Sequence, residues 1–348
     1  MKKKVVSILL ILIFTLLTAV YVIKSEDPAA LSSMPANIKY GYFSAAIALM
    51  VIYWLFDGFL LMKLVESVSR KIVFKHSFHI SMAVQFFNAA TPFAGGGQPV
   101  AVYLLKRKGL TYGESTAVVV IKSLVWQGTL LAITVFTLIL NFGYLTKNIA
   151  GFFPLFVIGV VTNLALILFY CMFFSRSLMT KIMNGLCNIL SKTRLRKSIV
   201  KMKENLNREI ALMASALKKL REHKKEWAEL LLATCVQITA FCSVLYFIQA
   251  ACEPSVSDFF DLLTSQTMVT MISGLIPSPG AAGGAEGIGY IFFKRFFKPT
   301  SILAAVLIWR FITYYLNLLI GGVFCLINKD RPLKLKKRAE STANKGAN

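Results

Sequence analysis

Glu286 and Arg310 are charged side chains in sequence that is otherwise apolar. Each lies twelve residues from Lys298, which belongs to the basic turn between them. At 1.5 Å per helical residue each leg is about 18 Å long. Both charges are therefore predicted near the middle of a hydrocarbon core about 30 Å thick. Because an isolated charge at that depth costs about 3 kcal/mol or more, we expect the two to pair or to share a cavity.

Gln98 and Lys122 repeat this spacing, since each lies twelve residues from Leu110. At the centre of a membrane a guanidinium or an ammonium can hold a phosphate. A carboxylate beside it can balance charge, meet a cationic group or titrate. We therefore take Glu286, Arg310, Lys122 and Gln98 as the candidate binding residues. The alternative, a buried structural salt bridge, stays open at this point.

The backbone is expected to be irregular beside these residues. Residues 273–288 read SGLIPSPGAAGGAEGI and residues 91–99 read TPFAGGGQP. Proline bars a regular helix, and glycine adopts backbone angles closed to other residues. At an offset of about 187 residues Pro92 aligns with Pro279, and a basic cluster follows each copy. We interpret this as an internal repeat. The predicted helix breaks are Pro92, Gly96, Gly97, Pro277, Pro279, Gly280, Gly283 and Gly284.

Composition indicates an all-α polytopic membrane protein. Hydrophobic residues make up 56% of the chain, and the mean hydropathy is +0.65, values far from those of a soluble domain. The net charge of +23 is typical of positive loops that lie on anionic lipid. No zinc spacing or aromatic-basic RNA motif accompanies it. We therefore expect no metal, no cofactor and no direct contact with nucleic acid.

Six apolar runs are long enough to cross a bilayer, at 5–23, 40–62, 115–141, 152–174, 227–251 and 300–327. Two further apolar segments, 78–105 and 259–297, are interrupted at their centres. The arms of the first are about 13 residues long, short of the roughly 20 that a span needs. Each interrupted segment is therefore predicted to be a re-entrant helical hairpin. Asp57, near the end of the second run, is expected to pair with the neighbouring Lys63.

The distribution of Lys and Arg predicts that both termini are cytoplasmic. Three crossings then separate the two hairpins, and an odd number makes them enter from opposite faces. Two like units of opposite orientation are the pattern of an inverted-repeat transporter. We predict a membrane domain over 1–328, with the first repeat at about 40–174 and the second at about 227–328. A basic tail, 329–348, is expected to be disordered.

The connector 176–226 carries fourteen Lys and Arg against four Asp and Glu. Apolar residues recur in it at three- and four-residue spacing from Ile199 to Leu220, which predicts an amphipathic helix with a basic face. We expect residues 192–226 to lie on anionic lipid of the inner leaflet. A solvated connector is the alternative.

The segment LIPSPGAAGGAEG, followed by an Arg-bearing helix, resembles the Pro-x-x-Pro-Gly-Gly…Glu signature of the lysylphosphatidylglycerol synthase transmembrane-region family. That family comprises the flippase half of the multiple peptide resistance factor and its stand-alone relatives. TPFAGGGQP and the following YLLKRKGLTYGESTAVVVIKSLVWQG look like its first motif. The resemblance covers residues 5–328. Gln98 stands where an acid is expected and Lys122 where an arginine is expected, and Ala281 and Ala282 are inserted in the second glycine run.

The resemblance implies translocation of a lipid between the leaflets of a bacterial plasma membrane. The lipid would be aminoacylated phosphatidylglycerol, or another anionic or polyprenyl-phosphate lipid. A role in resistance to cationic antimicrobial peptides is also implied. In two-domain members a soluble domain makes the aminoacylated lipid from charged tRNA. We expect only a short tail after Lys329, so the chain by itself is not expected to be an enzyme.

Two alternatives stay open. In the first, the chain is a phosphatidylglycerol lysyltransferase, or the membrane half of a split one with a separate soluble aminoacyltransferase as its partner. In the second, it is a membrane scaffold that transports nothing. The sequence does not predict the oligomeric state.

Overall fold

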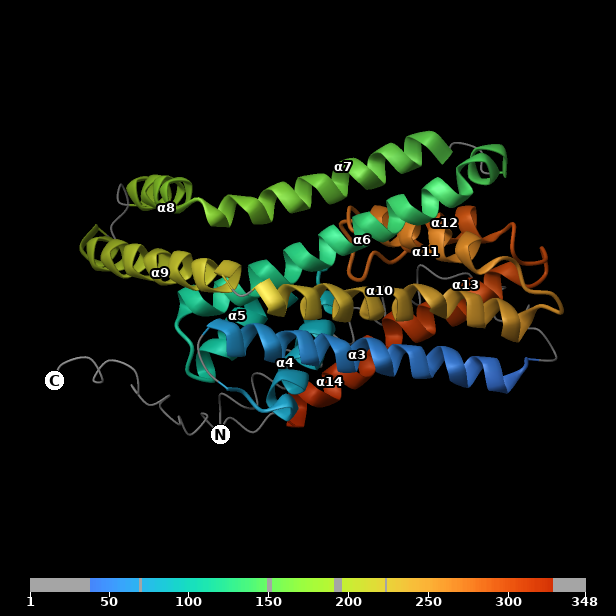
Figure 1. Cartoon of the computed structure of the whole chain (residues 1–348), viewed down its shortest axis with the longest axis horizontal. Coiled ribbons are helices and arrows are strands. Elements are labelled where there is room, and N and C mark those ends of the chain that lie inside the picture. Colours follow the sequence, from blue (N-terminus) through green and yellow to red (C-terminus); the bar gives the residue numbers. More distant parts are fainter. Residues whose placement is uncertain (1–37, 69–70, 149–151, 191–195, 223, 328–348) are drawn as a thin grey trace.

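The computed structural model describes residues 38–68, 71–148, 152–190, 196–222 and 224–327, and these are folded as helices joined by short turns (Figure 1). In chain order the helices are α3 (Tyr40–Val68), α4 (Phe74–Ala90), α5 (Gly97–Arg107), α6 (Tyr112–Asn148), α7 (Phe152–Cys171), η1 (Met172–Phe174), α8 (Arg176–Leu190), α9 (Arg196–Glu222), α10 (Lys224–Cys252), α11 (Phe259–Ser273), α12 (Gly284–Phe293), α13 (Ile302–Arg310), η2 (Phe311–Tyr315) and α14 (Leu316–Ile327). The last three run on without a turn, and η2 is one π-helical turn between two α-helices.

Five helical segments among the described residues are long and apolar enough to cross a membrane: Tyr40–Val68, Tyr112–Leu140, Phe153–Phe174, Glu226–Cys252 and Ile302–Ile327. They correspond to five of the six predicted spans, and the chain is a polytopic membrane protein. The first predicted span, 5–23, and the tail, 329–348, lie outside the described residues. The second span runs on to Val68 rather than ending at 62, because Leu64, Val65 and Val68 are buried in a core shared with α6 and α9.

The two interrupted segments each form a pair of short helices. The first pair, α4 and α5, has 17 and 11 residues, and the second pair, α11 and α12, has 15 and 10. All four are shorter than the roughly 20 residues that a span needs. The pairs approach each other from opposite ends of the molecule (Figure 1). Their breaks meet, because Pro92 and Pro279 form an isolated antiparallel bridge.

The backbone at both breaks departs from the ordinary helical region. Phe93, Ala94 and Ala281 have positive φ angles of 56°, 50° and 58°, which cost about 1–3 kcal/mol each for residues with a side chain. Gly280 and Gly283 also have positive φ, of 58° and 83°, without that penalty. The helices α4 and α11 end at Ala90 and Ser273, ahead of the predicted prolines, whereas Gly97 and Gly284 are the first residues of α5 and α12. Such strain persists only where surrounding contacts hold it.

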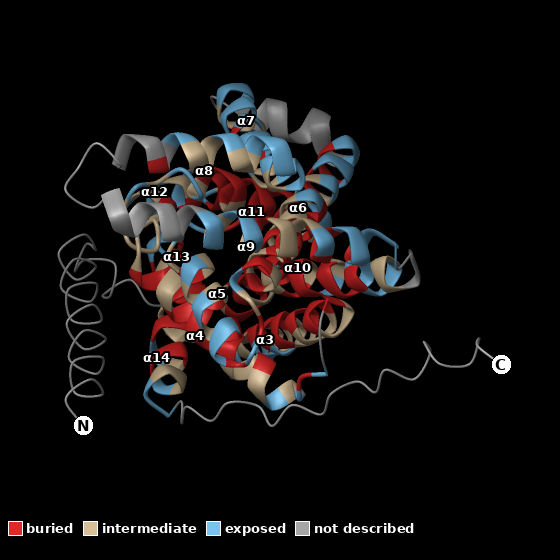
Figure 2. Cartoon of the chain, turned by 90° about the vertical axis from the view of Figure 1, so that its left-hand side faces the viewer, coloured by how far each residue is buried: buried red, intermediate tan, exposed pale blue. Residues whose placement is uncertain are grey.

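The core lies between the spans rather than around α7. Figure 2 shows buried residues gathered in α3, α10 and α11, and exposed ones along α7 and α8. The α7 surface is apolar, with Phe153, Val161 and Leu168 exposed. An apolar exposed face suits a helix that is surrounded by lipid.

The basic connector contains two helices, α8 and α9, rather than one. Met213, Leu217 and Leu220 of α9 are buried against α3 and α6. The side chain of Glu209 accepts a hydrogen bond from the Gly113 amide at 2.7 Å. The apolar face of this half of α9 therefore packs on the protein. Contact with anionic lipid stays a prediction for its basic face.

Gly321 of α14 allows a close approach to α4. A Cβ added there would lie 2.6 Å from the Met82 carbonyl oxygen and 3.0 Å from the Phe86 amide nitrogen. We predict that Gly321→Ala separates the two helices and lowers stability by about 1–3 kcal/mol, as overpacking does. Unfolding of the purified protein in detergent measures the loss. Gly128→Ala in α6 is the control, since a Cβ there meets nothing within 4 Å. Equal losses in the two variants would contradict the close contact.

Candidate functional site at the helix breaks

Glu286 and Arg310 form an ion pair beside the second break. Glu286 lies in the first turn of α12, and Arg310 is the last residue of α13. Arg310 Nε contacts Glu286 Oε1, and the two side chains are only 6% and 14% exposed. The predicted pairing is therefore confirmed. Arg310 Nη2 also donates a hydrogen bond to the Gly280 carbonyl at 2.8 Å. The guanidinium therefore binds both Glu286 and the backbone of the break.

Tyr314 joins this ion pair to the first break. Its ring centroid lies 4.3 Å from Arg310 Cζ, within range of a cation–π contact. Its hydroxyl donates a hydrogen bond of 3.3 Å to the Ala89 carbonyl, near the end of α4. Gly280 is needed for this approach, because a Cβ there would lie 1.9 Å from the Tyr314 ring. One aromatic side chain thus contacts groups from both breaks.

Lys122 belongs to a second cluster, in which Asp57 and Gln237 are buried and Lys122 is partly buried. Its Nζ lies 2.8 Å from Asp57 Oδ2, and Gln237 Nε2 donates to Asp57 Oδ1 at 2.9 Å. The cluster therefore links α3, α6 and α10. The predicted pairing of Asp57 with Lys63 is wrong, since Lys63 pairs with Glu229 at 2.8 Å. Residues three or four apart are neighbours on a helix surface, whereas these two are six apart.

Gln98 is not among the partners of Lys122 in the described part of the chain. It is half-buried in the first turn of α5 and makes no side-chain hydrogen bond within the described part of the chain. The start of α5 is instead capped by side chains from α4 and the break. The Gly97 amide donates to Asn88 Oδ1 at 3.0 Å, and the Gly96 amide donates to Thr91 Oγ1 at 2.8 Å. Of the candidate residues, the structure joins Glu286 with Arg310 only.

Sequence reasoning missed Asp57 and Gln237 as partners of the site. A carboxylate inside a long apolar run needs a partner, and that signal was available at Asp57. Gln237 carries no comparable signal, because an uncharged amide is less costly to bury. Within the described residues, no group of three or more His, Cys, Asp or Glu is placed to hold a metal.

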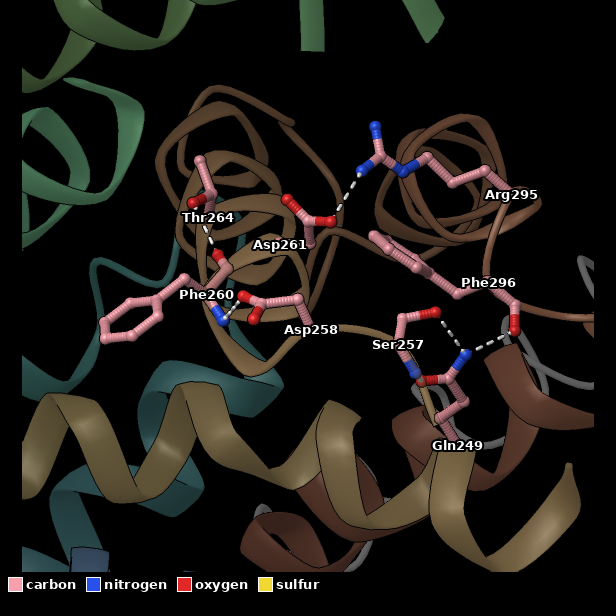
Figure 3. Close-up of polar contacts among 8 residues, drawn as sticks. All are labelled: Gln249, Ser257, Asp258, Phe260, Asp261, Thr264, Arg295 and Phe296. Atoms are coloured by element: carbon pink, nitrogen blue, oxygen red, sulfur yellow. Dashed lines mark hydrogen bonds and ion pairs between the residues drawn. The ribbon is translucent and has the colours of Figure 1, made fainter. Parts of the chain in front are cut away.

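A separate polar cluster fixes the base of the second helix pair to α10 (Figure 3). Gln249 Nε2 donates to the Phe296 carbonyl at 2.6 Å and to Ser257 Oγ at 3.0 Å. Asp261, in the first turn of α11, lies 3.7 Å from Arg295, which follows α12. Burial raises the pKa of the Asp261 carboxyl, and the nearby Arg295 opposes that shift. These contacts fix α11 and α12 in place at the ends that are remote from the break.

The Asp57–Lys122 pair is predicted to be important for stability. Lys122→Met leaves a buried carboxylate without its cation, which costs about 3–5 kcal/mol for a buried pair. The double change Lys122→Met with Asp57→Asn should restore most of that loss in denaturant unfolding. Lys63→Ala is the control, because its pair with Glu229 is much more exposed and is worth less than about 1 kcal/mol. A double variant as unstable as Lys122→Met would exclude charge burial as the cause.

Comparison with known proteins identifies the family of this chain. The sequence model of the family described as the lysylphosphatidylglycerol synthase TM region matches residues 4–321. This range includes both breaks and all four candidate residues. A UPF0104 membrane protein of Archaeoglobus fulgidus is 26% identical over 284 residues, covering 80% of this chain and 84% of the relative. The UPF0104 membrane protein MJ1595 of Methanocaldococcus jannaschii is 25% identical over 290 residues, covering 76% and 77%. The chain belongs to the lysylphosphatidylglycerol synthase TM region family.

Proposed function

We propose that this protein moves a phospholipid between the leaflets of a membrane. The observation that carries the proposal is the Glu286–Arg310 ion pair where two broken helix pairs meet. Charges inside membrane segments usually mark a pathway for a substrate or ion. Irregular backbone at membrane depth is tolerated where protein buries it or where it lines a water-filled cavity. Both features occur together here.

The architecture we propose is an inverted repeat of two re-entrant hairpins, α4 with α5 and α11 with α12. Three observations support it: the short arms, the approach of the pairs from opposite ends, and the bridge between Pro92 and Pro279. Three candidate spans, in α6, α7 and α10, lie between the two pairs along the chain. Transporters of this design bind their substrate where the two repeats meet.

In this proposal Arg310 holds the lipid phosphate, with Gln98 and Lys122 on the side of the first repeat. Glu286 balances the charge of Arg310 when no lipid is bound. The lipids that suit a buried guanidinium are aminoacylated phosphatidylglycerol and other anionic or polyprenyl-phosphate lipids. We place the protein in a bacterial plasma membrane with both termini in the cytoplasm, and the basic face of α9 on anionic lipid there.

A vesicle assay with headgroup-labelled phospholipids tests translocation. The double variant Glu286→Gln with Arg310→Met removes both charges together, so no buried charge is left unpaired. If the pair handles substrate, this variant should fold normally but lose translocation by at least about tenfold. The Gly128→Ala protein serves as a control that should retain activity. A folded double variant with full translocation would reduce the pair to a structural salt bridge. A wild-type protein that moves no lipid would favour a scaffold.

The proposed orientation is tested by labelling single cysteines in a cysteine-free background. Arg107 is the last residue of the first hairpin and Lys298 follows the second, and both residues are exposed. Arg107→Cys should react with an impermeant maleimide only after the cytoplasmic face is opened. Lys298→Cys should react in intact cells. Lys108 is unsuitable as a reporter because it is buried. Reaction of both positions from one side would contradict the inverted repeat.

A further inference from the structure

The two candidate cations, the buried Arg310 and the partly buried Lys122, are each neutralised before any substrate arrives. Arg310 is paired with Glu286 and Lys122 is paired with Asp57, so these four charges sum to zero. A phosphate that approached either cation would add an unbalanced negative charge in surroundings of low dielectric constant, where such a charge is costly. Binding therefore requires that a carboxylate be displaced and that its charge be removed.

The two carboxylates differ in how firmly they are held. Asp57 lies within the long helix α3 and is held from two other helices, by Lys122 and Gln237. Glu286 lies on a ten-residue helix directly after the break, and among the described residues Arg310 is its one charged partner. A Cβ added at Gly283 or Gly287 would meet nothing within 4 Å, so the start of α12 is not closely packed at these two positions. Of the two carboxylates, Glu286 is therefore the one held by fewer contacts.

We propose that a lipid phosphate binds Arg310 by displacing Glu286, and that Glu286 takes up one proton from water as it leaves. This step rests on the proposed function and adds its coupling to protons. The guanidinium exchanges one anionic partner for another, and the carboxylate becomes a neutral carboxylic acid. One negative charge enters with the phosphate and one positive charge enters with the proton. The site is therefore neutral before and after binding.

Few other titratable groups face Glu286. The helices in closest contact with α12 are α11 and α13. Their charged residues are Asp261, at the far end of α11 beside Arg295, and Arg310 itself. The remaining titratable groups on α12 and η2 are the hydroxyls of Tyr290, Tyr314 and Tyr315. Tyrosine titrates well above neutral pH, so of these groups Glu286 is the carboxylate in contact with Arg310.

Calorimetry of the full-length protein in detergent tests the proposal, with dioctanoyl-phosphatidylglycerol as the probe. Titrations in buffers of different ionisation enthalpy count the protons taken up per lipid bound. We expect close to one, with Kd rising about tenfold per pH unit where Glu286 is ionised in the free protein. Glu286→Gln should bind the lipid without proton uptake and with a Kd that does not depend on pH. Asp261→Asn is the matched control, since it changes another acid of the same hairpin, and it should keep the uptake.

Binding to the wild type without proton uptake would overturn the proposal and leave lipid translocation as proposed. Uptake that persists in Glu286→Gln would also overturn it, because another group would then carry the proton. If Glu286→Gln does not fold, the infrared band of a protonated carboxyl group decides: it must appear when lipid is added to the wild type. Failure to bind the lipid at any pH would reject both the exchange and Arg310 as a phosphate site. Proton-linked binding by a protein that moves no lipid would count against translocation alone.

Discussion

A charge or an unpaired peptide group costs several kcal/mol in hydrocarbon, and this cost shapes the interior of the protein. Arg310 is buried and Lys122 is partly buried in apolar spans, and each has a carboxylate partner. Neither partner is on the same helix as its cation. The need to neutralise charge therefore ties helices together: α12 to α13 at one place, and α3 to α6 at the other.

The same constraint explains the polar side chains that surround the two breaks. Interrupting a helix frees backbone groups, and in a membrane these cannot be left for solvent to satisfy. Asn88 and Thr91 accept hydrogen bonds from the amides that open α5. Arg310 and Tyr314 donate to carbonyl groups beside the breaks. Arg310 thus has two roles, since it holds the irregular backbone and carries the charge of the candidate site.

The two halves of the molecule share an outline but differ in chemistry. In the second half the acid that faces the cation comes from the short helix after the break. In the first half Gln98 occupies the equivalent place, and the acid comes from a long span instead. The carboxylate at the end of a short helix is held by fewer contacts than the one held by two neighbouring helices. In our proposal this asymmetry makes Glu286 the carboxylate that exchanges and Asp57 a structural partner.

The sequence by itself determined most of the helical elements and the pairing of Glu286 with Arg310. Long apolar runs predicted the five described spans, and proline with glycine predicted the breaks. Glu286 and Arg310 lie the same number of residues from the turn at Lys298. This predicted that they would meet, because a constant rise per helical residue brings both back to the same level. Only the tertiary structure decided which partner Lys122 takes, how α9 packs and how Gln249 fastens the second helix pair. Depth does not specify which faces of two helices touch, and Asp57 and Lys122 meet across 65 residues of sequence through the packing of α3 against α6.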